Sequence, residues 1–474
     1  MVSLAQDLRS ALDLAQRSGH VLTQVTRPID PHMVIIMDFL ESYRTPEGSW
    51  MADDQPLRMY TSPTRGQFPV LMGMFGSRRL CRLFLDPKGS YAADISDAQL
   101  LMQAVDNPVA AHVLEKARLP RSVVKQPDLA RLLPVLSYGS RDPGPTITLG
   151  LVYARDAKAG IGNCSFHRIT VKDGSVAIGI YPGGHLQRLI DAHVARGVQL
   201  SVSVNIGIDP AIYLASVLGR PSVDFGFDEL AAAGALREMA VEIAPCFHNQ
   251  GWFIDHAEIT LEGTLGEEME FESPFPDGLS MPEYLGYQSP CGMVSTLKIQ
   301  AATFRPDAVY QTLSGPGMEQ STLLGIGQEC AVYAKLREWR MLDLVRSVVS
   351  LPSGGGHLLT VLQVSKKAPQ DDTKILNIAE ALIGEISSLK NLLIVDWDVN
   401  ARSPADVLWA LATRSRLDMD IHASAVLPGT PLDPSQSREY ARQERDGTTR
   451  KCVVDCTVPS GLQTRFRRAF VGDL

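Results

Sequence analysis

The sequence predicts a multidomain protein of mixed class, in which two α/β regions flank a β-rich centre. Three observations carry this prediction. Both ends of the chain alternate amphipathic helical patterns with short apolar runs, and residues 140–310 hold several runs that alternate as strands do. In that centre, the order strand, hairpin, helix, strand does not repeat as a βαβ array would. We therefore expect domains at 1–135, 136–310 and 311–474, the central one a β-barrel decorated with helices.

The first region opens with an amphipathic helix. Ser3 is placed to cap it, Gly19 to end it, and its inner stripe is formed by Leu4, Leu8 and Leu12. The apolar runs at 68–75 and 82–86 are typical of strands, and residues 96–103 have a helical pattern. Nothing in this region gathers catalytic side chains.

The central region is organised around residues 163–185. Asp173-Gly174 is a strong hairpin-turn signal between two β-rich runs. A two-residue turn places Lys172 opposite Ser175 and Arg168 opposite Gly179, and extending that ladder brings Asn163 close to Gly184 and His185. The sequence thus gathers an amide, a guanidinium and an imidazole at the open end of one hairpin.

A helix is expected directly after His185. Its inner face carries Leu186, Leu189, Ile190 and Val194, and Gly197 ends it. The positive N-terminal end of this helix favours an anion at the same place. Gly183 and Gly184 leave room for a ligand near the backbone. This is a plausible site for a phosphate held with a metal ion.

Asn163, His185 and Glu229 are the candidate metal ligands. An amide oxygen, an imidazole and a carboxylate suit Mn²⁺ or Mg²⁺ better than Zn²⁺. From spacing alone, a histidine before a helix is also compatible with a purely structural role, and both interpretations stay open at this point. The helical runs 210–218 and 228–237 interrupt the central strands, and Glu229 opens the second of them.

An acidic loop at 266–277 is the second candidate constellation. Glu267, Glu268 and Glu270 are typical of a solvated turn. Glu272 and Asp277 differ, because Pro274 and Pro276 stiffen the segment between them.

The last region has the pattern of an α/β domain. We expect strands at 358–364 and 391–396, a helix at 374–390 between them, and a further helix that starts at Ser403-Pro404.

Composition bounds the function. The net charge of −8 argues against a nucleic-acid partner. No apolar run reaches the roughly 20 residues that span a bilayer, so we expect no membrane partner. The N-terminus lacks the basic start of a signal peptide, and the seven cysteines are scattered. We therefore expect reduced thiols and a cytoplasmic protein.

These stretches resemble the UbiD family of decarboxylases, which use prenylated FMN. The likeness rests on Asn-x-Ser-x-x-Arg at 163–168, Gly-His at 184–185, Glu229 in Glu-x-x-x-Ala-Gly-x-Leu-Arg, and the loop from Glu272 to Asp277. It runs from about residue 140 to residue 456. In the loop, Ser273 and Pro276 replace two family glycines. The resemblance implies a central split β-barrel related to flavin reductases, between an N-terminal α/β domain and a C-terminal α/β domain that builds homodimers or larger assemblies.

The resemblance also implies roles for single residues. The metal, Mn²⁺ or Mg²⁺ with K⁺ as a further ion, would be held by Asn163, His185 and Glu229. The catalytic residues would be Arg168, Glu272 and Asp277, with Asp277 as proton donor and Glu272 second. Further cofactor contacts would come from Thr148, Ser165, Arg168, Gly184 and Lys366, with Lys367 as the alternative to Lys366.

The function that the resemblance implies is the reversible, non-oxidative decarboxylation of an α,β-unsaturated or (hetero)aromatic carboxylic acid. Tyr181, Gly184 and Leu324 fall at family pocket positions, and a flavin prenyltransferase would supply the cofactor. Two alternatives remain. An FMN-dependent oxidoreductase would show nicotinamide-dependent flavin reduction. A non-catalytic flavin-binding assembly protein would retain the modified flavin without releasing CO₂.

Overall fold

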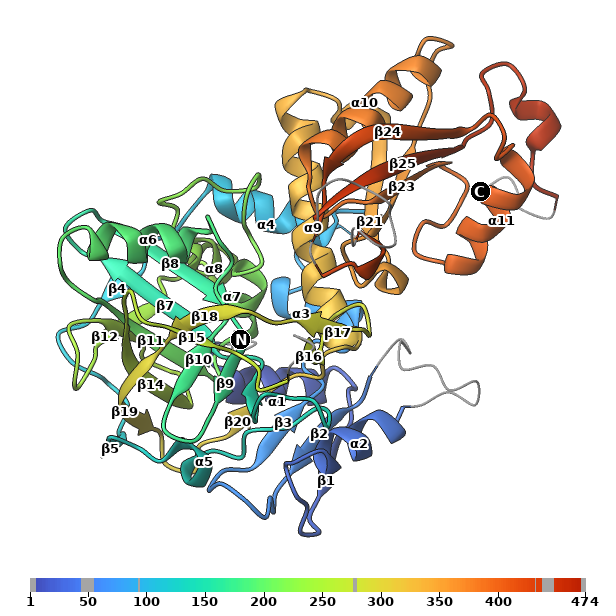
Figure 1. Ribbon diagram of the computed structural model, residues 1–474. Helices are drawn as coiled ribbons and strands as arrows, with labels where there is room; N and C mark the ends of the chain where they lie inside the picture. The colour runs from blue at the N-terminus through green and yellow to red at the C-terminus, as the bar shows by residue number, and fades with distance from the viewer. Residues whose placement is uncertain are drawn as a thin grey trace. The chain divides into compact units, whose positions relative to one another are not determined.

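The computed structural model describes residues 6–43, 55–92, 94–275, 279–430, 432–436 and 447–469. The chain divides into two compact units, Met1–Leu323 and Leu324–Leu474, and Figure 1 shows that both mix helices with sheets. Helix α9 (Met318–Glu338) begins in the first unit and continues into the second. In the described segments, no helix combines the length and apolar character needed to cross a bilayer.

The N-terminal part of the first unit is built on a four-stranded sheet with the order β1 (Leu22–Val25), β2 (Leu57–Tyr60), β3 (Val70–Met72) and β20 (Tyr310–Gln311). Its helices are α1 (Leu8–Arg17), α2 (Val34–Glu41), α3 (Arg78–Leu85), α4 (Asp97–Asp106) and α5 (Leu129–Leu132).

Two predictions for this part were wrong. The N-cap of α1 is Asp7 and not Ser3, because the helix starts at Leu8, and Asp7 accepts the Ser10 N–H at 2.8 Å. The helix buries Leu8, Ala11, Leu14 and Ala15. Ser3 and Leu4 lie outside the described residues. Residues 82–85 belong to α3 rather than to a strand, and Asp86 is the C-cap, since Ser77 caps a helix whose apolar residues recur with helical spacing.

The central part consists of two larger antiparallel sheets. The six-stranded sheet has the order β5 (Ser122–Lys125), β19 (Lys298–Phe304), β14 (Ile259–Leu265), β11 (Leu200–Ile206), β7 (Leu151–Asp156) and β8 (Ile161–Phe166). The five-stranded sheet has the order β15 (Met269–Phe271), β18 (Met293–Thr296), β10 (Val176–Ile178), β9 (Ile169–Val171) and β6 (Thr146–Ile147). There are two small sheets. One has the order β13 (Trp252–Ile254), β12 (Glu242–Pro245) and β4 (His112–Val113), and the other pairs β16 (Leu279–Pro282) with β17 (Gln288–Pro290).

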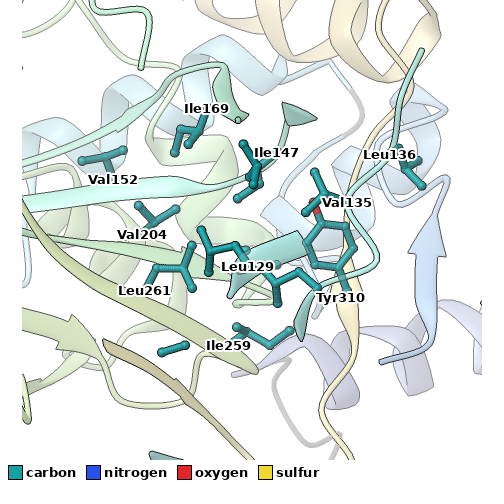
Figure 2. Packing of buried hydrophobic residues seen from close by; sticks show 14 of the residues in the cluster. Leu129, Val135, Leu136, Ile147, Val152, Ile169, Val204, Ile259, Leu261 and Tyr310 are labelled. Atoms are coloured by element: carbon teal, nitrogen blue, oxygen red, sulfur yellow. The ribbon is translucent and has the colours of Figure 1, made fainter. Parts of the chain in front are cut away.

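One apolar core joins these sheets. Figure 2 shows Ile147 and Ile169 from the five-stranded sheet beside Val204 and Leu261 from the six-stranded sheet, with Tyr310 of β20 in the same cluster. Strand pairing also crosses the predicted boundary at residue 135, because β5 pairs with β19 and β20 pairs with β3. The first two predicted domains therefore share one compact unit, and their division at 135 stays a prediction.

The predicted hairpin is present, but it does not extend to Asn163. Lys172 N–H donates to the Ser175 carbonyl at 2.9 Å and Gly179 N–H donates to the Arg168 carbonyl at 3.1 Å, as predicted for the Asp173-Gly174 turn. Asn163 instead lies on β8 in the six-stranded sheet, opposite Ala154 of β7. The chain leaves that sheet after Phe166 and enters the five-stranded sheet at Ile169, so the single ladder predicted from the sequence is wrong.

Three helices cover this region: α6 (His185–Val194), α7 (Pro210–Ala215) and α8 (Glu229–Arg237). Helix α6 buries Leu186, Leu189 and Ile190, and Gly197 beyond its end has a φ of +70°. Both α6 and α8 contact β8. The helix predicted after His185 is confirmed.

The second unit is a five-stranded sheet with helices. Its order is β21 (Val345–Ser350), β22 (Leu359–Val364), β23 (Asn391–Asp396), β25 (Thr448–Cys456) and β24 (Ile421–Pro428), and the three middle strands are parallel. Its remaining helices are α10 (Asp371–Glu385), α11 (Pro404–Arg414), η1 (Leu342–Leu344), η2 (Pro352–Gly354), η3 (Pro434–Gln436) and η4 (Gln463–Phe466).

The middle strands of this sheet are apolar on both faces. Leu392 and Ile394 pack into one cluster with α10, whereas Leu393 and Val395 pack into a second cluster with α11. This explains the continuous apolar runs from which the strands at 358–364 and 391–396 were predicted.

Candidate active site

Arg168 lies at the start of the β9–β10 hairpin and binds two carboxylates. Its Nε and one terminal nitrogen donate to the two Glu272 oxygens at 2.6 and 2.7 Å, and its other terminal nitrogen donates to Glu283 at 3.1 Å. Gly179 permits this position, because a Cβ there would lie 3.2 Å from the Arg168 side chain. The structure therefore brings together Arg168 and Glu272, two of the three residues expected to be catalytic.

The two carboxylates come from different segments: Glu272 lies in the acidic loop at 266–277, and Glu283 lies beyond it, after β16. Glu272 follows β15, is 1% exposed, and donates its backbone N–H to the Gly292 carbonyl at 3.0 Å. Glu283 follows β16, where its backbone N–H donates to the Tyr287 carbonyl at 2.9 Å. Glu283 also accepts from the Gln320 amide at 3.4 Å. Burial lowers the pKa of Arg168, but the ionic contacts with Glu272 and then Glu283 outweigh it and raise this pKa above its usual range.

Sequence reasoning missed Glu283. It chose Asp277 from the family spacing, and Asp277 lies outside the described residues, as does Pro276. The acidic loop carries several carboxylates, and spacing alone does not say which one returns to Arg168. A feature that could have indicated Glu283 is the short turn at Glu283–Tyr287, which reverses the chain so that β17 pairs with β16.

The candidate metal ligands come from three elements, of which α6 and α8 each contact β8. Asn163 lies on β8, His185 is the first residue of α6, and Glu229 is the first residue of α8. Glu229 reaches the edge of β8, where its carboxylate accepts the Cys164 N–H at 2.7 Å. The N-terminal end of α8 thus lies at β8, and α6 contacts the same strand. A helix N-terminus favours a bound anion such as a phosphate.

Each candidate ligand has an atom that suits a cation. Within the described residues, the His185 Nε2 is buried without a hydrogen-bond partner, and Asn163 contacts Ser165 through its side-chain nitrogen rather than its oxygen. Burial raises the pKa of the Glu229 carboxyl well above its usual range. The pKa of His185 is lowered by burial and then by the nearby charges of Arg220 and Arg188. A neutral imidazole, an amide oxygen and a carboxylate that needs a counter-charge fit Mn²⁺ or Mg²⁺.

The motif around Glu229 has a structural basis. Asp228 caps α8 by accepting the Leu230 N–H at 3.0 Å. A Cβ at Gly234 would come within 2.5 Å of the Val109 carbonyl oxygen, so only glycine allows this close packing. Arg237 is buried and donates to Asp209 at 2.8 and 2.6 Å and to the Phe84 carbonyl at 2.8 Å. The small residues and the arginine therefore hold α8, and with it Glu229, in place.

Thr148, Ser165 and Gly184, which were also predicted to contact the cofactor, lie on three different segments of the first unit. Thr148 lies between β6 and β7, where its hydroxyl is 2.9 Å from both the Tyr138 and Thr312 hydroxyls and donates to the Leu313 carbonyl at 3.1 Å. Ser165 shares a face of β8 with Asn163 and contacts its amide nitrogen at 3.0 Å. Gly184 is the N-cap residue of α6.

Lys366 belongs to the second unit and is largely enclosed there. Its ammonium donates to the Thr457 hydroxyl at 2.6 Å and the Val458 carbonyl at 2.9 Å, and it forms an ion pair with Asp372 at 2.7 Å. Three partners match the three donors of an ammonium group. Lys367 is more exposed and lies 3.7 Å from Asp343. A phosphate contact from either lysine stays a prediction.

Comparisons with known proteins agree on one family. Residues 112–317 match the 3-octaprenyl-4-hydroxybenzoate carboxy-lyase Rift-related domain, UbiD, and residues 321–456 match the C-terminal domain of the same family. The chain is 30% identical over 384 residues to gallate decarboxylase from Lactiplantibacillus plantarum, with 78% of each protein covered.

Solved structures extend this likeness over the whole fold. The apo structure of 3,4-dihydroxybenzoic acid decarboxylase from Enterobacter cloacae matches with a TM-score of 0.89 and 32% identity, covering 99% of this chain and 97% of the other. The UbiD-class enzyme HmfF from Pelotomaculum thermopropionicum, in complex with FMN, matches with a TM-score of 0.84 and 27% identity, covering 99% and 98%. The predicted mixed α/β UbiD-like fold is confirmed, and the chain belongs to the UbiD family of carboxy-lyases.

Proposed function

We propose that this protein catalyses the reversible, non-oxidative decarboxylation of a hydroxylated benzoic acid with prenylated FMN as cofactor. The observation that carries the proposal is the contact of Arg168 with Glu272 and Glu283. The names of two relatives, gallate decarboxylase and 3,4-dihydroxybenzoic acid decarboxylase, support the substrate class.

Arg168 is suited to hold the substrate carboxylate. A guanidinium has five N–H donors, and three of those of Arg168 are directed at Glu272 and Glu283. The remaining two can bind a carboxylate in the two-pronged manner that a lysine cannot reproduce. When bound, the modified flavin supplies the electron sink for cleavage of the carbon–carbon bond.

A carboxylic acid must then deliver a proton to the substrate carbon. Asp277 is the donor proposed from the sequence, with Glu272 second, and the structure adds Glu283 as a third candidate. Because Glu272 engages Arg168 through both oxygens, it is suited to hold the arginine in place.

Asn163, His185 and Glu229 would hold Mn²⁺ or Mg²⁺, and the flavin phosphate would lie at the starts of α6 and α8. A flavin prenyltransferase as supplier, K⁺ as a further ion, and a homodimer or larger assembly are part of the same proposal.

The test of the activity is co-expression with a flavin prenyltransferase, followed by measurement of the mass and absorbance of the bound cofactor. Gallate and 3,4-dihydroxybenzoate should release CO₂, whereas cinnamate should be a poor substrate. Absence of CO₂ release from every acid by protein loaded with the modified flavin would contradict the proposal.

The donor is identified by three single variants, Asp277→Asn, Glu283→Gln and Glu272→Gln. Each removes an acid and keeps its shape. The donor's variant should lose both product formation and deuterium incorporation from heavy water, with the flavin retained. A silent Asp277→Asn beside an inactive Glu283→Gln would transfer the donor role to Glu283. Silence of all three variants would place the chemistry elsewhere.

A further inference from the structure

A chain of hydrogen bonds runs from Asn163 to the hairpin that carries Arg168. The Asn163 side-chain nitrogen lies 3.0 Å from the Ser165 hydroxyl oxygen, and this oxygen lies 2.8 Å from His167 Nε2. On the other side of the ring, His167 Nδ1 lies 3.0 Å from the Gly179 carbonyl oxygen. None of the roles proposed above uses His167.

The Gly179 carbonyl, at the end of this chain of hydrogen bonds, determines which group donates in each of them. A carbonyl oxygen only accepts, so His167 Nδ1 must carry the proton that it shares with Gly179. Burial lowers the pKa of His167 to about 4, so the ring is neutral at pH 7 and its Nε2 has a lone pair. The Ser165 hydroxyl must then donate to Nε2.

With its proton committed to His167, the Ser165 oxygen can only accept from Asn163. The Asn163 NH₂ group therefore faces Ser165, and its carbonyl oxygen faces away. The contacts match this order, since the nitrogen is the atom 3.0 Å from Ser165. The oxygen is the atom that a metal ion needs.

We propose that His167 is a positioning residue that orients the Asn163 amide, so that its oxygen rather than its nitrogen is presented to the metal ion. The inference rests on the proposed metal site. A neutral imidazole suits the task because it donates at one end and accepts at the other. Removing a residue that hydrogen-bonds to a metal ligand typically weakens the affinity of the protein for the metal by about 10- to 100-fold.

Two substitutions of His167 separate positioning from packing. In His167→Gln the side-chain oxygen can reach the place of Nε2 and accept from Ser165. In His167→Asn the shorter amide can replace only Nδ1 and its bond to Gly179, so Ser165 loses its acceptor. The Ser165 hydroxyl is then free to donate to Asn163, which allows the Asn163 amide to rotate so that its oxygen faces Ser165 instead of the metal ion.

The measurement is the affinity for Mn²⁺ in the presence of FMN, from the electron paramagnetic resonance signal of free Mn²⁺. We expect His167→Asn to weaken binding at least about tenfold and His167→Gln to stay within about threefold of the wild type. Ser165→Ala should match His167→Asn, and the double variant should lose no more than either single one, because both break one chain. Circular dichroism and the melting temperature without metal check the fold of each variant.

Equal losses in the Asn and Gln variants, no loss in either, or additive losses in the double variant would overturn the inference. Glu229→Gln separates it from the proposed function. If Glu229→Gln abolishes Mn²⁺ binding while His167→Asn leaves it intact, only the role of His167 falls. If the wild type binds no Mn²⁺ with FMN, the metal site and this inference fall together.

Discussion

Replacing Arg168 by lysine keeps the positive charge and removes the fork. In the structure, Arg168 makes bonds of 2.6 and 2.7 Å to Glu272 and one of 3.1 Å to Glu283. A single ammonium on a flexible stem can keep about one of these three contacts and cannot hold the substrate carboxylate in two places.

The expected loss follows from the bonds removed. A hydrogen bond to a charged group contributes about 1.5–3 kcal/mol, so loss of the two proposed bonds to the substrate carboxylate costs at least about 3 kcal/mol of transition-state stabilisation. Since each 1.36 kcal/mol is about tenfold in rate, decarboxylation should fall by about two orders of magnitude or more. The cofactor should remain bound, because the proposed metal and phosphate contacts lie on β8, α6 and α8.

The assay is kcat/KM for CO₂ release beside flavin content from absorbance. Arg305→Lys is a matched control, because Arg305 also joins two carboxylates, Asp7 at 3.1 Å and Glu258 at 3.2 Å, in the same unit. It should leave kcat/KM unchanged. Activity of Arg168→Lys within about threefold of the wild type, which is only about 0.7 kcal/mol, would remove Arg168 from the catalytic residues.

Three further predictions concern binding and stability. Glu229→Gln should lower both metal and flavin content of the purified protein, measured by elemental analysis and absorbance, and full occupancy would refute the assignment. Glu319→Ala leaves three buried backbone N–H groups without their acceptor and should reduce the free energy of unfolding by about 3 kcal/mol or more in urea titrations, whereas the exposed Glu338→Ala on the same helix should change it by less than about 0.5 kcal/mol. Burial lowers the pKa of His357 from 6.5 to about 4, so between these pH values the unfolded state binds more protons than the folded state and the free energy of unfolding falls, by up to about 3 kcal/mol, as the pH is lowered. In His357→Gln this part of the pH dependence should disappear. An unchanged dependence of the free energy of unfolding on pH would contradict the prediction.

Local features were predictable because their causes are local. The Asp173-Gly174 turn sets which residues of the hairpin face each other, and the predicted pairs Lys172–Ser175 and Arg168–Gly179 are the observed ones. Ser403 was predicted to cap α11, and its hydroxyl accepts the Asp406 N–H at 3.3 Å. The short apolar run at 82–86 shows the limit, since its length fits a strand or one turn of a helix.

The amino-acid sequence by itself determined the turn of the hairpin, the helices that start at His185 and Glu229, and the side chains available for chemistry. Tertiary structure alone decided that Asn163 lies in another sheet than the β9–β10 hairpin that follows Arg168, and that Glu283 meets Arg168 across 115 residues of chain. The physical reason is that helix periods, caps and turns depend on neighbours a few residues away, whereas the path of a loop depends on the sheets between which it runs. Spacing in a motif cannot tell which of several carboxylates that path returns to an arginine.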